Sequence, residues 1–137
     1  MGSGVGMHAL GFFLLVILIS AVFTSAYTYA NLSLDCPLVK NKLEPWLWDK
    51  LKLLEANGTT RFYTITISMI GFSPVQGYEG RKGVADFLKE RHNATILSIG
   101  KVLNYINLRV RVPEIKRIAW YYFVELVGDG ERIITPD

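Results

Sequence analysis

The 137 residues carry a net charge of +3 at pH 7, with both signs interspersed along the chain. This length suits one domain of ordinary size, and the small mixed charge argues against a dedicated binder of polyanions. The single cysteine, Cys36, cannot form a disulfide within the chain, so the fold must be held by its hydrophobic core.

The chain starts with an apolar segment. Residues 1–34 contain no Asp, Glu, Lys or Arg, and 9–23 form an apolar run of fifteen. That is the length of a signal-peptide core and is short of the ~20 residues of a comfortable membrane span. The segments Thr24-Ser25-Ala26 and Thr28-Tyr29-Ala30 place small residues where signal peptidase needs them, but the positively charged start of a signal peptide is missing. We therefore expect a cleaved signal peptide or a membrane anchor through residues 9–30, with the remainder secreted or held at the cell membrane facing outward.

Three sequons support an extracytoplasmic location. Asn31, Asn57 and Asn93 each precede a Ser or Thr by two residues, and the chain has only six asparagines. Each sequon alone is a weak signal. Together they predict a glycosylated, exposed surface.

A helix is predicted over residues 45–56. Pro45 suits the first turn of a helix, where its missing N–H is not needed. Leu47, Leu51 and Leu54 fall on one stripe of that helix. We expect an extra amphipathic helix ahead of the main domain.

The chain then alternates between strand and helix periods. In the first strand, apolar residues alternate with Thr64, Thr66 and Ser68, and Pro and Gly residues mark the following loop. The predicted elements are strand 61–70, loop 71–80, helix 81–92, strands 94–102 and 105–112, helix 113–121, strand 124–127 and turn 128–130.

This β-α-β-β-α-β order is the split βαβ of the ferredoxin-like fold, an α+β class in which two helices cover one face of an antiparallel sheet. The other face is expected to carry polar residues of the first and third strands: Thr64, Thr66, Ser68, Asn107, Arg109 and Arg111. The predicted organisation is a signal or anchor at 1–30, a helical extension at 31–60, the α+β domain at 61–130 and an extended tail at 131–137.

Catalytic chemistry is not indicated. His8 lies in the export segment, and His92 ends a helix with no carboxylate or Cys constellation evident around it. No serine sits in a nucleophile elbow, and no Cys/His set has the spacing of a metal site. We expect no enzyme activity, no metal and no cofactor.

One motif imitates a nucleic-acid site. Gly80-Arg81-Lys82-Gly83 leads into a helix, as does the GxxG loop with which KH domains clamp a nucleic-acid backbone. However, Glu79 stands where that family buries an apolar residue, and the segment before it is broken by Pro74 and Gly77. We interpret the motif as a helix-entry turn and expect no nucleic-acid partner.

Several segments together resemble a known family. They are the strand 62–67, the helix-to-strand passage 84–96, the hairpin 102–106, the helix start 113–119 and the closing strand 123–127. In order and spacing they are similar to the propeptide of subtilisin-like serine proteases and to the stand-alone inhibitors built on that domain. The resemblance covers about residues 62–137. It departs after the last strand, where Gly128-Asp129-Gly130 replaces the family's acidic pair.

The resemblance implies that the polar sheet face packs on two surface helices of the protease. Glu125 or Asp129 would cap the N-termini of those helices, where unpaired N–H groups favour an anion. The protease-facing residues would be Thr64, Thr66, Asn107, Arg109, Glu125 and Asp129.

The tail would enter the active-site cleft as an extended strand and pair its backbone with the enzyme. Placing Asp137 at the scissile position puts Ile134 in the fourth subsite. The full tail is Glu131, Arg132, Ile133, Ile134, Thr135, Pro136 and Asp137.

No protease domain follows in this chain, so the expected function is an exported inhibitor or a trans-acting folding chaperone of a subtilisin-like protease. The alternative is a non-catalytic structural or adhesion module of the cell surface, held to the membrane by its N-terminal segment.

Overall fold

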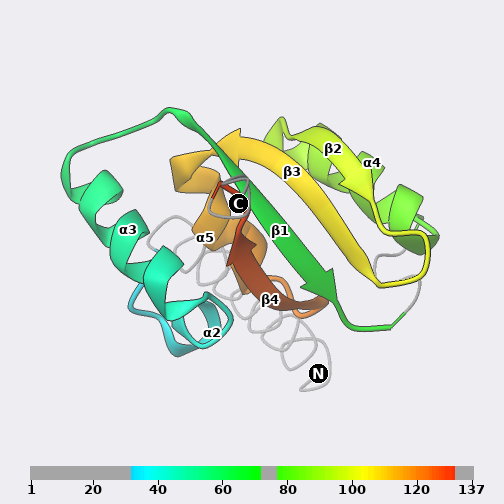
Figure 1. Ribbon diagram of the computed structural model, residues 1–137, viewed down its shortest axis with the longest axis horizontal. Coiled ribbons are helices and arrows are strands. Elements are labelled where there is room, and N and C mark those ends of the chain that lie inside the picture. Colours follow the sequence, from blue (N-terminus) through cyan, green and yellow to red (C-terminus); the bar gives the residue numbers. More distant parts are fainter. Residues whose placement is uncertain (1–31, 72–76, 132–137) are drawn as a thin grey trace, which may run out of the picture. The chain divides into compact units, whose positions relative to one another are not determined.

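The computed structural model describes residues 32–71 and 77–131 (Figure 1). The chain divides into two compact units, Met1–Leu32 and Ser33–Asp137. The second unit contains α2 (Pro37–Lys40), α3 (Pro45–Ala56), β1 (Phe62–Met69), α4 (Gly80–His92), β2 (Thr95–Ile99), β3 (Tyr105–Arg111), α5 (Val112–Trp120) and β4 (Val124–Asp129).

The predicted export segment, residues 1–30, lies outside the described residues. Within the described ranges, no helix has the length and apolar character needed to cross a membrane.

The four strands form one antiparallel sheet in the order β2-β3-β1-β4. Helices α4 and α5 both lie behind this sheet in Figure 1, so the opposite side faces the viewer. The predicted α+β class with a four-stranded antiparallel sheet is confirmed. Its core lies between the sheet and the helices and includes fully buried Tyr63, Ile65, Ile67, Leu88, Ile106, Leu108, Ile115 and Ile118.

The N-terminal extension is joined to the sheet by backbone hydrogen bonds. Leu43 forms an isolated parallel bridge with Val127 of β4. The Val127 N–H donates to the Lys42 carbonyl at 2.7 Å, and the Glu44 N–H donates to the Val127 carbonyl at 3.1 Å. This pairing covers part of the outer edge of β4, and α3 then packs against α5 and β4.

The end of β4 differs from the sequence prediction. Gly128-Asp129-Gly130 was expected to be a turn, but Gly128 and Asp129 continue the strand opposite Thr66 and Ile65. Gly130 lets the backbone lie close to Thr64, because a Cβ on Gly130 would lie 2.8 Å from Thr64 Cγ2. A glycine in a strand can mark such an approach as well as a turn.

Two further features differ from the sequence prediction. Strand β2 ends at Ile99, three residues before the predicted end, because residues 100–104 form a loop to which Arg81 donates at the carbonyls of Gly100 and Leu103. The short helix α2 was not predicted, since the four residues Pro37–Lys40 are too few for a periodic pattern.

Candidate functional site

The open face of the sheet brings four of the predicted site residues together. Thr64 of β1 is paired with Arg109 of β3, and Thr66 is paired with Asn107. Paired residues on neighbouring strands point to the same side of a sheet. Because the side chains of Ile65 and Ile67 pack in the core, these four side chains lie on the side away from α4 and α5. Thr64 is nevertheless only 8 % exposed, whereas Thr66 and Asn107 are half-buried and Arg109 is exposed.

A polar ladder crosses the middle of this face. Thr66 donates its hydroxyl to Asn107 Oδ1 at 2.5 Å, and Asn107 Nδ2 donates to Ser98 Oγ of β2 at 2.7 Å. These three residues are uncharged, and each already has a hydrogen-bond partner within the sheet. Each of these polar side chains keeps at least one hydrogen bond if the ladder is buried under another protein, which lowers the cost of desolvation. Ser98 was missed because its place depends on the register of β2.

Glu125 lies at the rim of the same face. The register of β1 against β4 shifts between Ser68 and Met69, and this irregularity turns Glu125 outward. It lines a hollow of about 400 Å³ with Thr66, Ser68, Met69, Leu103, Asn104 and Tyr105. A carboxylate beside hydroxyl groups in an open hollow suits a donor-rich partner such as a helix N-terminus.

Asp129 lies on the opposite side, which corrects the expectation that it faces a partner. It is paired with the buried Ile65 and is only 2 % exposed. Its Oδ1 accepts from the Tyr63 hydroxyl at 2.9 Å and from the Glu131 N–H at 3.0 Å. Simple alternation would put residues 125 and 129 on one face. The bulge at Glu125 breaks that alternation, so of these two residues only Glu125 reaches the open face.

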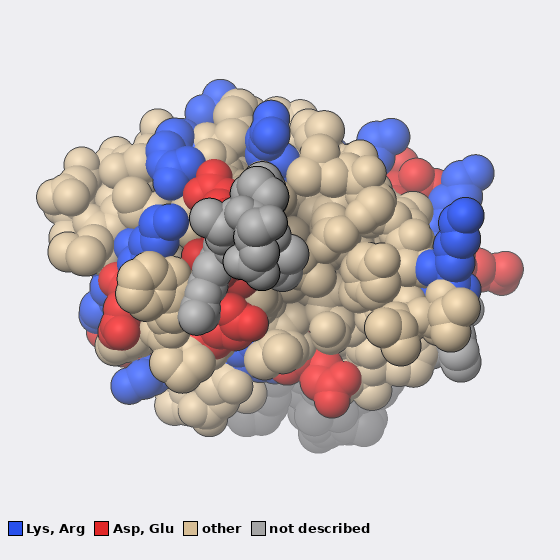
Figure 2. All heavy atoms as spheres, in the orientation of Figure 1, with Lys and Arg blue, Asp and Glu red and all other residues tan. Residues whose placement is uncertain are grey.

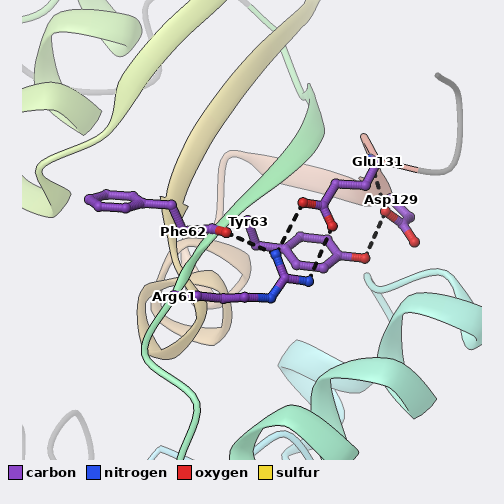
Figure 3. A network of polar contacts seen from close by, with 5 residues as sticks. All are labelled: Arg61, Phe62, Tyr63, Asp129 and Glu131. Carbon is purple, nitrogen blue, oxygen red and sulfur yellow. Dashed lines mark hydrogen bonds and ion pairs between the residues drawn. The ribbon is translucent and has the colours of Figure 1, made fainter.

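The start of the predicted tail is held by a second network (Figure 3). The guanidinium of Arg61 contacts Glu131 through two N···O pairs of 3.2 and 3.4 Å, and it lies 4.9 Å from the centre of the Tyr63 ring. Burial, followed by the hydrogen bond to Asp129, raises the pKa of Tyr63 well above its ordinary value of 10.0. Glu131 is therefore fixed to the beginning of β1, while residues 132–137 lie outside the described residues.

The Tyr63 hydroxyl predicts an alkaline loss of stability. Because its pKa is raised in the folded state, its contribution is complete below about pH 10, the ordinary tyrosine value, and is lost as pH rises through the higher folded value. Tyr63→Phe should remove this dependence, and at neutral pH it should cost about 1–3 kcal/mol because it takes the hydroxyl donor from the buried Asp129 carboxylate. Urea unfolding at pH 7, 9 and 11 measures both effects. A variant whose stability still falls as steeply above pH 10 would contradict this assignment.

His92 has a carboxylate partner, contrary to the sequence prediction. Its Nδ1 lies 2.8 Å from Glu114 Oε2, and its Nε2 lies 2.8 Å from the Tyr121 hydroxyl. The sequence could not reveal this contact, because Glu114 belongs to α5, twenty-two residues further along the chain, and only the fold brings it to His92. The His92 side chain is 1 % exposed, and its two contacts join the end of α4 to Glu114 of α5 and to Tyr121.

The GxxG motif begins helix α4. Gly80 and Gly83 lie in its first turn, and a Cβ on Gly83 would come within 2.5 Å of the Tyr78 backbone, so close packing explains this glycine. Asn57 and Asn93 are exposed, and Asn31 lies outside the described residues. Over residues 32–71 and 77–131, no three His, Cys, Asp or Glu side chains are placed to hold a metal ion.

Comparison with known proteins gives no matching family model, no matching curated protein and no matching solved structure.

Proposed function

We propose that this protein is an exported, non-catalytic partner of a subtilisin-like serine protease, acting as its inhibitor or as its folding chaperone. The domain is proposed to be ferredoxin-like, which is supported by the strand order β2-β3-β1-β4 with α4 and α5 on one side. The observation that carries the proposal is the open face with its paired ladder Thr66–Asn107–Ser98. It offers a protein surface with few unpaired polar groups in its centre.

In the proposed complex, this face packs on two surface helices of the enzyme. Glu125, exposed at the rim hollow, meets the N–H groups at a helix N-terminus, where the helix dipole favours an anion. Thr66, Asn107 and Arg109 lie under the contact, beside the buried Thr64. Asp129 has a different part: its bonds to Tyr63 and to the Glu131 backbone hold the end of the sheet from which the tail departs.

The tail is proposed to bind the active-site cleft. The ion pair between Arg61 and Glu131 supports a defined starting point for it, because it ties the first tail residue to the start of β1. Arg132 to Asp137 would pair with the enzyme as an added strand, as in β-augmentation.

An extracytoplasmic location is part of the proposal. The exposed positions of Asn57 and Asn93 are compatible with use of both sequons. Residues 9–30 would reach the membrane as a signal peptide or remain there as an anchor.

The test is an inhibition titration of residues 31–137 against several subtilisin-like proteases. A second protein ending at Glu131 keeps the Arg61 ion pair and lacks only residues 132–137 of the tail. We expect inhibition by the longer protein and a loss of at least about 100-fold in the shorter one, because the cleft contacts are removed.

Equal inhibition by both proteins would remove the tail from the mechanism. Digestion without inhibition by every protease would overturn the proposed function and favour the cell-surface module. That alternative is supported by two exposed hydrophobic side chains of the extension, which could contact another protein: Leu38 is 59 % exposed and Leu53 is 67 % exposed.

A further inference from the structure

The charges of the open face lie at opposite ends of β1. Arg109 and Arg111 stand beside Thr64 and Phe62 near the start of β1, whereas Glu125 stands beside its end at the Ser68/Met69 irregularity. Four to six residues of strand separate the two ends, which is about 13–20 Å. Figure 2 shows uncharged residues over most of β3, with Lys or Arg atoms at the upper rim of this face and Asp or Glu atoms at its lower rim.

The two arginines are arranged to receive anions. They are two residues apart on β3, so their side chains leave the same face of the strand about 7 Å apart. Arg111 is oriented from within the domain: its Nη1 donates to the Thr60 carbonyl at 3.0 Å, and its Cζ lies 4.4 Å from the centre of the Phe62 ring. Arg109 is exposed and makes no hydrogen bond or ion pair with any described residue. A guanidinium offers two parallel donors that match a carboxylate.

A protein fits this face better than a nucleic acid. Binding of a phosphate backbone needs a run of cations along its path. Here the two arginines are followed by the neutral ladder of Ser98, Thr66 and Asn107 and then by Glu125, which repels phosphate. A partner with carboxylates at one end of its contact surface and N–H donors at the other matches the whole face.

We propose that Arg109 and Arg111 bind a pair of carboxylates on the partner protein and thereby fix its orientation on the sheet. The identity of the partner as a subtilisin-like protease rests on the proposed function; the carboxylate site does not. Docking in the reverse sense would bring the partner's carboxylates to Glu125, and such like-charge contacts suppress the wrong orientation. The arginine pair therefore acts as a specificity determinant, selecting proteases with an acidic patch beside the two helices.

The first experiment measures association rates with a protease that the full chain, in mild detergent, inhibits. Arg109→Glu/Arg111→Glu is compared with Lys82→Glu/Lys89→Glu, two exposed lysines of α4 with the same total change of charge. We expect association about tenfold slower for the arginine pair at low salt, a smaller difference at high salt, and little change for the lysine pair. Equal slowing by both pairs, or no slowing by either, would overturn the proposal while leaving the proposed function intact.

The second experiment does not need a protease. The full chain is titrated with a peptide of four glutamates, blocked at both ends, while backbone amide signals are followed by NMR. We expect shifts confined to the C-terminal end of β3, abolished in Arg109→Gln/Arg111→Gln and kept in Lys82→Gln/Lys89→Gln. If no protease is inhibited but these shifts appear, the proposed function fails and the carboxylate site stands. The proposed carboxylate site is overturned if no shifts appear, or if the shifts are lost in Lys82→Gln/Lys89→Gln and kept in Arg109→Gln/Arg111→Gln.

Discussion

Replacing Leu47 by alanine should lower the free energy of unfolding by about 2–4 kcal/mol, because the side chain is fully buried and its removal leaves a cavity. Leu47 belongs to α3, which the sequence suggested to be an extension separate from the sheet domain. In the structure α3 packs on α5 and β4, and the Trp48 indole donates to the Leu34 carbonyl at 2.8 Å. The extension and the sheet should therefore unfold together.

Leu53→Ala is the matched control on the same helix. Leu53 is 67 % exposed, and leucine and alanine have similar helix propensities, so its effect should stay within about 0.5 kcal/mol. Urea unfolding followed by circular dichroism and by tryptophan fluorescence would report both variants. If Leu47→Ala left the main transition in place and only melted a separate early phase, the extension would be an independent part.

Replacing Thr66 by lysine should weaken protease inhibition by at least about 100-fold. Thr66 stands at the centre of the open face on β1, with β3 on one side and β4 on the other. A lysine there places an unpaired charge where the enzyme would cover it, and an uncompensated charge buried in an interface is strongly unfavourable. The loss of the hydrogen bond to Asn107 should cost only about 1 kcal/mol of stability.

Ala56→Lys provides the control, since it adds the same charge at the exposed end of α3. It should inhibit as well as the unmodified protein. Inhibition constants for both variants, together with their urea midpoints, separate loss of binding from loss of folding. A Thr66→Lys variant that inhibits normally would remove the open face from the proposed contact.

The fold was predictable where local pattern and tertiary packing agree. The alternation in β1 and the apolar stripes of α4 and α5 each reflect one buried side, so the order of elements and the four-stranded sheet could be read from the sequence. The placement of Thr64, Thr66, Asn107 and Arg109 on one face follows from the same alternation.

The sequence predictions that were wrong, and the contacts that were missed, depended on a β-bulge or on residues far apart in the sequence. Asp129 was assigned to the wrong face because the β-bulge before it breaks the alternation in β4. The partners of His92 come from residues 114 and 121, and no local pattern connects them. The Arg61–Glu131 pair joins residues seventy positions apart, and it too required the fold.

The central claim is that this domain binds a subtilisin-like protease, and the most direct measurement is complex formation with an enzyme that cannot cut it. Residues 31–137 would be mixed with several such proteases whose catalytic serine has been replaced, and binding would be followed by calorimetry. We predict a one-to-one complex with at least one of them, weakened by Thr66→Lys and unaffected by Ala56→Lys. No binding to any of these proteases would contradict the account.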